Sequence, residues 1–192
     1  MFEISYTNAL EKGGTMSYQE ILSRFIYDDE TEIMDRISKV NKSDYRENKD
    51  IINEIVLWKM NRRPQVDENV IENLYGLDIL GTPLEAAESE LTAQVVELLL
   101  LSKGMQLPMA STVLHFYFPS IYPIIDQRAY RELYGEEYPK YITKVETQVK
   151  MYMKYISDCY QYQQKQCPEI PFAKIDKVLY QMDKEKGFKV KY

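Results

Sequence analysis

The chain has few of the residues that build metal centres and covalent cross-links. Its 192 residues include two cysteines, Cys159 and Cys167, and a single histidine, His115. Two cysteines are too few for a disulfide framework or for the four-ligand set of a structural zinc or iron–sulfur site. We therefore expect no metal and no cofactor, and a protein whose thiols stay reduced, as in the cytoplasm.

Long apolar runs are also absent. No stretch reaches the ~18 to 20 apolar residues of a membrane span. The opening MFEISYTNALEKGG lacks the basic and apolar regions of a signal peptide. We expect no membrane contact, a cytoplasmic location and a monomeric state.

The chain has no excess of positive charge. Its formal net charge is −6, which argues against a protein that binds polyanions through overall charge. The charge is uneven, however: residues 1–135 hold 13 Lys and Arg against 22 Asp and Glu, and residues 136–192 hold 11 against 8. An anion-binding surface would therefore have to be local.

Helical periodicity dominates the sequence, and no run alternates as a strand would beyond the short YPII of residues 122–125. Caps, prolines and glycines predict helices at about 17–27, 30–40, 48–61, 68–75, 82–103 with a break at 89–92, 108–118, 127–134, 140–164 and 172–186. The prediction is one compact all-α unit of about eight or nine helices without a substantial sheet. A division into two lobes is expected after Asp126: residues 45–126 would form one, and residues 127–192 with the N-terminal helices the other.

Residues 98–126 have the pattern of a helix, a tight turn and a second helix. Gly104 can adopt the positive φ that such a turn needs, and Pro108 fits the first turn of the following helix. The free N–H groups at that helix start can bind an anion without a basic side chain. An acidic protein can hold a nucleic-acid phosphate in this way.

This segment resembles a known family. GMQLPMASTVL, followed by HFYFPSIYPIID, is similar to the helix-hairpin-helix Gly/Pro…Asp (HhH-GPD) signature of the base-excision DNA glycosylases, which include endonuclease III and MutY. The 22-residue separation of Gly104 and Asp126 keeps the family spacing. The close similarity covers about thirty residues.

The resemblance implies a role for each matching position. Asp126 would be the catalytic carboxylate, stabilising positive charge on the sugar or helping to activate water. Double-stranded DNA would be the partner, contacted by the hairpin at Lys103, Gly104, Met105, Gln106, Leu107, Pro108 and Ala110. Arg128 and Arg131, at the start of the next helix, are separate candidates for DNA contact beside the cleft.

Two departures from the family pattern limit the implied chemistry. Gln106 stands where the family has a second hairpin glycine, and Pro108 stands where bifunctional members carry the lysine that forms a Schiff base. The four-cysteine iron–sulfur loop is absent too. The implied activity is therefore that of a monofunctional glycosylase.

Each candidate residue also has a structural interpretation. Asp is a favoured N-cap, so Asp126 is expected to cap the helix that follows, with or without a catalytic role. His115 is either an acid–base or phosphate-binding residue or a hydrogen-bonded histidine between helices. Arg128 and Arg131 either contact phosphate, pair with Asp126 or lie on the surface.

The segment from Trp58 to Arg63 ends an apolar helix with an aromatic ring and three cations. Trp58, Lys59 and Arg62 are candidates for the rim of a base pocket. Alternatively, the cations complement the helix dipole and the indole packs in the core.

Two functions of different classes therefore stand as hypotheses. The first is hydrolytic release of a damaged or mispaired base from DNA. The alternative is a non-catalytic helical module that binds nucleic acid or protein, and a small-molecule site in the same cleft is a third, weaker option. An open, cation-lined cleft at Asp126 would favour the enzyme, whereas burial of that carboxylate would favour the module.

Overall fold

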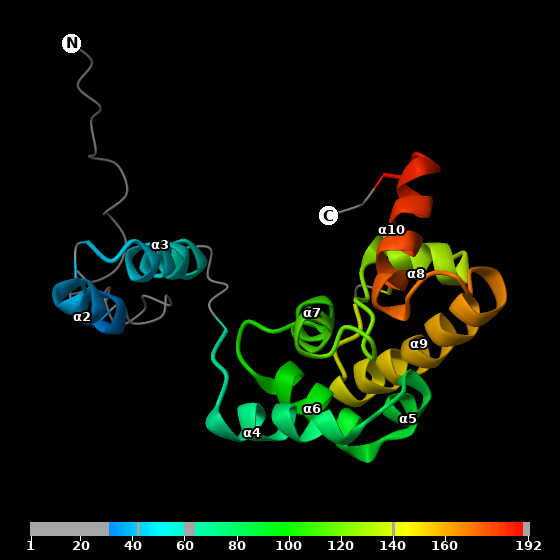
Figure 1. Ribbon diagram of the computed structural model, residues 1–192, viewed down its shortest axis with the longest axis horizontal. Helices are drawn as coiled ribbons and strands as arrows, with labels where there is room; N and C mark the ends of the chain where they lie inside the picture. Colours follow the sequence, from blue (N-terminus) through cyan, green and yellow to red (C-terminus); the bar gives the residue numbers. More distant parts are fainter. Residues whose placement is uncertain (1–30, 42, 60–63, 140, 190–192) are drawn as a thin grey trace, which may run out of the picture. The chain divides into compact units, whose positions relative to one another are not determined.

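The computed structural model describes residues 31–41, 43–59, 64–139 and 141–189 (Figure 1). These residues contain nine α-helices and two short 3-10 helices, and the prediction of an all-α fold with eight or nine helices is confirmed for them. The only extended pairing in the described chain is one antiparallel bridge, between Gln65 and Lys103. The helix expected at 17–27 lies outside the described residues. The helices are α2 (Thr31–Lys39), α3 (Tyr45–Lys59), α4 (Glu68–Gly76), η1 (Leu77–Ile79), α5 (Pro83–Glu88), α6 (Glu90–Leu101), α7 (Leu107–Tyr117), α8 (Gln127–Tyr134), α9 (Val145–Gln166), η2 (Phe172–Lys174) and α10 (Ile175–Glu185).

The chain divides into two compact units, residues 1–61 and 62–192. In the first unit α2 packs on α3, and the pair buries Ile33 and Ile51. Met34 and Ile37, which share a predicted apolar face with Ile33, are instead 61% and 44% exposed, because two short helices bury only one narrow stripe.

The observed division differs from the expected lobes. Residues on both sides of Asp126 share one apolar core, since α9 packs against α5 and α6 as well as against α8 and α10. A boundary after Asp126 would cut through this core. The boundary instead follows α3, within the segment that the sequence assigns to the first lobe.

Local signals set several helix ends in the second unit. Thr82 accepts a hydrogen bond from the Glu85 amide, and the Glu85 carboxylate accepts one from the Thr82 amide, which completes a capping box at the start of α5. Ser89 caps α6 and produces the break expected near residue 89. Gly135 ends α8 with φ of +72°, a conformation that favours glycine.

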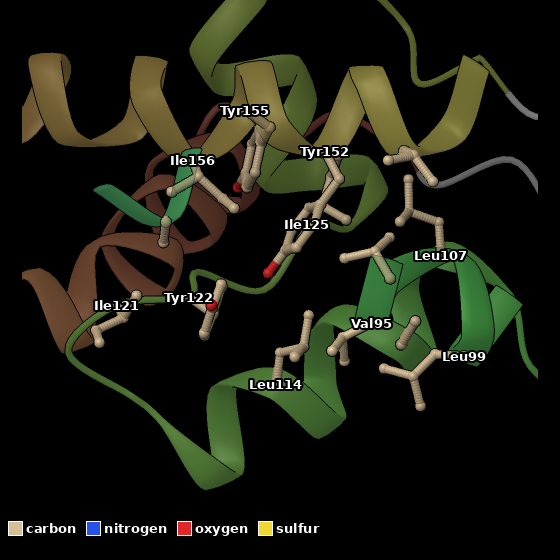
Figure 2. Packing of buried hydrophobic residues seen from close by; sticks show 14 of the residues in the cluster. Val95, Leu99, Leu107, Leu114, Ile121, Tyr122, Ile125, Tyr152, Tyr155 and Ile156 are labelled. Atoms are coloured by element: carbon tan, nitrogen blue, oxygen red, sulfur yellow. The ribbon is translucent and has the colours of Figure 1, made fainter. Parts of the chain in front are cut away.

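The core of the second unit lies between α9 and the helices around it. Figure 2 shows Tyr152 and Tyr155 reaching from α9 towards the extended segment that contains Tyr122 and Ile125. All four side chains are fully buried. Because aromatic rings bury large areas, these contacts stabilise the position of a segment that belongs to no helix or sheet.

Candidate functional site

The extended segment before Asp126 is held by side chains from two helices. The carbonyl groups of residues 122–124 accept hydrogen bonds, in chain order, from His115 Nδ1 at 2.8 Å, Tyr152 Oη at 3.0 Å and Tyr155 Oη at 3.0 Å. A carbonyl only accepts, so His115 carries its hydrogen on Nδ1. These bonds replace the ladder that a sheet would provide.

The amide groups of the same segment are also satisfied. Ile124 donates to Asp176 Oδ2 at 3.3 Å, and Ile125 donates to Ser111 Oγ at 3.1 Å. The donors and acceptors therefore come from α7, α9 and α10 together. The backbone that leads into Asp126 is fixed from three sides.

Asp126 caps α8 with one of its two carboxylate oxygens. Oδ1 accepts hydrogen bonds from the amides of Arg128 and Ala129, each at 2.8 Å. Oδ2 has no hydrogen-bond partner in the described residues, yet it is not sealed from solvent. The cap therefore leaves one oxygen free to meet a ligand.

The electrostatic surroundings of Asp126 disfavour its charge. Burial raises the pKa of this carboxyl above its usual value, and the negative charge of Asp176 adds to the rise. The hydrogen bonds from Ala129 and Arg128 and the positive charge of Arg128 oppose it, but the net pKa is raised.

A pocket of about 660 Å³ opens beside Asp126. Its walls come from the start of α8 and from the end of α10 with the turn that follows: Asp126, Gln127, Arg128, Tyr180, Lys184, Gly187, Phe188 and Lys189. Gly187 has φ of +76°, and this left-handed turn directs the chain beyond α10 back along the pocket wall.

The pocket combines one carboxylate with three cationic side chains. Arg128 donates through Nη1 to Asp183 at 3.0 Å and to the Phe188 carbonyl at 3.1 Å, so it ties the turn after α10 to the start of α8. Lys184 and Lys189 make no ion pair within the described chain. The pocket rim is therefore positive although the protein as a whole is acidic.

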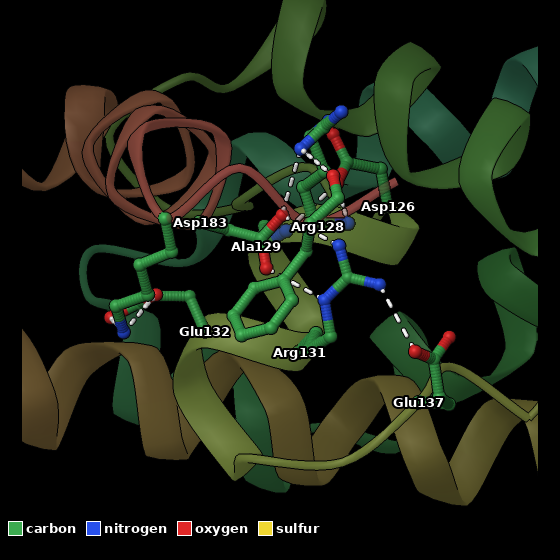
Figure 3. A network of polar contacts seen from close by, with 9 residues as sticks. Asp126, Arg128, Ala129, Arg131, Glu132, Glu137 and Asp183 are labelled. Carbon is green, nitrogen blue, oxygen red and sulfur yellow. Dashed lines mark hydrogen bonds and ion pairs between the residues drawn. The ribbon is translucent and has the colours of Figure 1, made fainter. Parts of the chain in front are cut away.

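Arg131 does not take the DNA-contacting position expected for it. Its guanidinium grips the buried Asp183 through Nε at 2.7 Å and Nη2 at 2.8 Å, and Nη1 meets Glu137 at 3.2 Å (Figure 3). Asp183 is 1% exposed and needs a counter-ion, which α8 supplies across its contact with α10. Arg131 is therefore an interior ion-pair partner.

The predicted hairpin is only partly open to a ligand. Gly104 has the expected positive φ of +80°, and α6 and α7 are separate helices. However, the amides of Met105, Met109 and Ala110 bond to carbonyls of the chain itself, contrary to the expectation that they face solvent or an anion. Met105, Leu107 and Ala110 are buried because their apolar side chains fill the core.

What remains exposed at the hairpin is small. The amides of Gln106 and Leu107 have no hydrogen bond within the described chain, but Leu107 is fully buried, so Gln106 alone presents a free amide at the surface. Gln106 caps α7 without a side-chain bond. Pro108 occupies the first turn of α7 as expected. Lys103 is exposed and pairs through its backbone with Gln65.

The other candidates are not among the residues that line the Asp126 pocket. His115 is 6% exposed and holds the Tyr122 carbonyl, as the structural interpretation predicts. Trp58 and Lys59 end α3 in the first unit, whereas the pocket lining comes from the second. Arg62 lies outside the described residues.

Sequence reasoning identified Asp126 and Arg128 but missed most of the pocket lining. Gln127, Tyr180, Lys184, Phe188 and Lys189 line it, and none was a candidate. The Gly187 turn at the end of a helix was the one available signal that the chain reverses there. Its packing against α8 depends on contacts more than 50 residues apart.

Two kinds of feature are absent from the described residues. No helix there has the length and apolarity to cross a bilayer, and no group of three or more His, Cys, Asp or Glu residues is arranged to hold a metal ion. No family model, curated protein or solved structure matches this chain.

Proposed function

We propose that this protein is a monofunctional DNA N-glycosylase, which hydrolyses the bond between a damaged or mispaired base and its sugar. One observation carries the proposal. Asp126 holds a carboxylate oxygen without a partner in the described residues, at the wall of a large pocket whose other charged side chains are cations.

The chemistry needs such a carboxylate. As the N-glycosidic bond breaks, its electron pair leaves with the base and positive charge develops on the sugar. A carboxylate in a partly buried site stabilises that charge more strongly than one in bulk water. Water then adds to the sugar carbon, loses a proton and leaves an abasic site.

The lining residues suit a nucleotide turned out of a duplex. Lys184 and Lys189 would meet backbone phosphates, and the rings of Tyr180 and Phe188 would offer faces for a base. Gln106 is exposed at the start of α7, and its unpaired amide offers a second phosphate contact.

Strand cleavage is not expected. Pro108 stands at the position where bifunctional members of the resembling family place a lysine. Lys184 and Lys189 are the lysines of the pocket, and neither matches that position. The product should therefore be an intact strand with an abasic site.

The test is base release from a panel of duplexes, each with one damaged or mispaired base, followed by alkali to reveal abasic sites. Asp126→Asn keeps the size and capping ability of the side chain but removes its charge. It should reduce the rate by about 10²-fold or more. Asp67→Asn, at the N-cap of α4, makes the same charge change outside the pocket and should leave the rate unchanged.

The result can contradict the proposal in two ways. Wild-type protein that releases no base and does not bind the duplexes at low salt would exclude a glycosylase. Base release that survives Asp126→Asn would leave the activity but remove Asp126 as its catalytic residue.

One observation favours the alternative, a non-catalytic binding module. Asp126 Oδ1 is fully used in capping α8, so the residue has a structural task that is sufficient to explain it. Tight binding of duplex DNA without base release, unaffected by Asp126→Asn, would support this module.

A further inference from the structure

Gln127 carries a polar group that the described protein leaves unused. Its Oε1 is the only buried side-chain oxygen or nitrogen without a hydrogen-bond partner in the described residues. Its amide nitrogen also donates to none of them. The residue lies next to Asp126 and lines the same pocket.

An unpaired amide in such a position is unfavourable for the free protein. A buried acceptor that loses water without gaining a donor destabilises the fold, so buried amides usually have partners. Gln163 shows the ordinary case, because its side chain donates to the Pro168 and Ile170 carbonyls at 3.4 and 2.8 Å. Gln127 has no equivalent anchor, although it begins a well-capped helix.

The surroundings of Gln127 indicate what would satisfy it. Tyr180 and Phe188 put aromatic rings in the same lining, and the Arg128 guanidinium stacks over the Tyr180 ring at 5.6 Å. A flat, polar ring can lie against such faces. Rotation of the carboxamide by half a turn exchanges its oxygen and its NH₂, so the group can face a ligand with a donor, an acceptor or both.

We propose that Gln127 is a specificity-determining residue, whose carboxamide contacts the amino-bearing edge of a base in the Asp126 pocket. The unpaired oxygen needs an N–H donor, and the amide NH₂ beside it needs an acceptor. An exocyclic amino group next to a ring nitrogen, as in adenine or cytosine, supplies both in one plane. The inference rests on the proposed function for its substrate class, but its binding step is separable from catalysis.

The first experiment compares the rates of base release by Gln127→Leu and by wild type on matched pairs of duplex substrates. Duplexes would carry adenine or unsubstituted purine, and cytosine or 2-pyrimidinone, at the target position, so that each pair differs by one amino group. Wild type should prefer the amino-bearing member, and Gln127→Leu should reduce that preference by about tenfold. Gln127→Leu should leave Tm equal or raise it by about 2–4 °C, since it deletes an unpaired buried oxygen.

Gln163→Leu is the matched control. It makes the same substitution at a glutamine whose hydrogen bonds are satisfied within the protein, so it should lower Tm and leave the base preference unchanged. Gln127→Leu could instead lower Tm as Gln163→Leu does, and change the release of the amino-bearing base and of its analogue by the same factor. In that case Gln127 has a structural role and the inference is wrong.

A second experiment decides the inference if no duplex loses a base. Binding of free adenosine and purine riboside would be measured by chemical-shift titration of wild type and Gln127→Leu. Tighter binding of adenosine by wild type, with the difference lost in the variant, would support the inference without a glycosylase. Equal binding of both nucleosides, or binding of neither, would overturn it.

Discussion

The phenol of Tyr155 donates a 3.0 Å hydrogen bond to the carbonyl of Ile124, so a side chain of α9 fixes the backbone two residues before Asp126. Tyr152 does the same for the carbonyl of Pro123. The candidate catalytic residue is therefore positioned by hydroxyl groups that lie 29 and 31 residues away from their acceptors.

Tyr155→Phe should destabilise the protein by about 1–2 kcal/mol, because it leaves a carbonyl in the core without its donor. Denaturant unfolding monitored by circular dichroism measures this difference. Tyr160→Phe, on the same helix, is the matched control, since Tyr160 contacts Phe172 through its ring and its hydroxyl has no hydrogen bond in the described chain. An equal loss of stability in both variants would contradict the proposed anchoring.

Asp183→Asn should be more destabilising than Tyr155→Phe, by about 3–5 kcal/mol, because it leaves the buried Arg131 with only the exposed Glu137 as an ionic partner. In the wild-type protein, the pKa of the Asp183 carboxyl is lowered chiefly by the hydrogen bonds from Arg131. A carboxyl with a lower pKa in the folded state stabilises the protein above its unfolded pKa, and this contribution is lost as pH falls through the folded value. The difference in the free energy of unfolding between wild type and Asp183→Asn should therefore be largest near neutral pH and should decrease below about pH 4.

Glu137→Gln is the control for that pair. Glu137 also contacts Arg131, but its side chain is 54% exposed, so its loss should change the free energy of unfolding by less than about 1 kcal/mol. Urea unfolding of the three proteins at several pH values gives both comparisons. A loss of unfolding free energy in Asp183→Asn that stays constant down to pH 2 would be inconsistent with the ion pair.

Asp126 should show the opposite pH dependence. Its pKa is raised in the folded protein by burial, so between the usual 3.8 and the raised value the folded state keeps a proton that the unfolded chain has lost. The contribution of Asp126 to the free energy of unfolding therefore decreases as pH rises through that range. Asp126→Asn should be at least as stable as wild type at pH 7, within about 1 kcal/mol, while Asp126→Ala should lose about 1 kcal/mol through its missing cap.

The rate of base release should depend on the same ionisation. If Asp126 acts as a carboxylate, the rate falls as pH decreases through its raised pKa, so the acid limb should lie above the 3.8 of an ordinary aspartate. Single-turnover rates from about pH 3 to 8 would locate this limb. An acid limb below 3.8, or one that persists in Asp126→Asn, would assign the titration to another group.

Much of the helical framework could be predicted because its signals are local. The capping box joins Thr82 to Glu85, and the cap at the helix break joins Ser89 to Thr92. Each signal therefore spans only three positions of the chain. Asp126 was likewise placed correctly as an N-cap. Such signals depend on short stretches of chain, which a sequence displays directly.

The site could not be predicted to the same extent, because its second wall comes from distant residues. Arg131 pairs with Asp183 across 52 positions, and no spacing rule connects them. The hairpin prediction failed at Met105 for a related reason: a glycine turn indicates a change of direction, but not which neighbouring side chains the core will bury. Apolar residues at 105 and 107 were the available sign.

The side-chain anchoring of the segment before Asp126 has a consequence for hydrogen exchange. The Ile124 and Ile125 amides lie outside every helix and strand, yet they donate to the side chains of Asp176 and Ser111. Their exchange with deuterium requires α10 or α7 to move away, and should be about as slow as that of the buried turns of α9. Ser111→Ala should speed exchange at Ile125 alone, which makes this amide a reporter for the rigidity of the approach to Asp126.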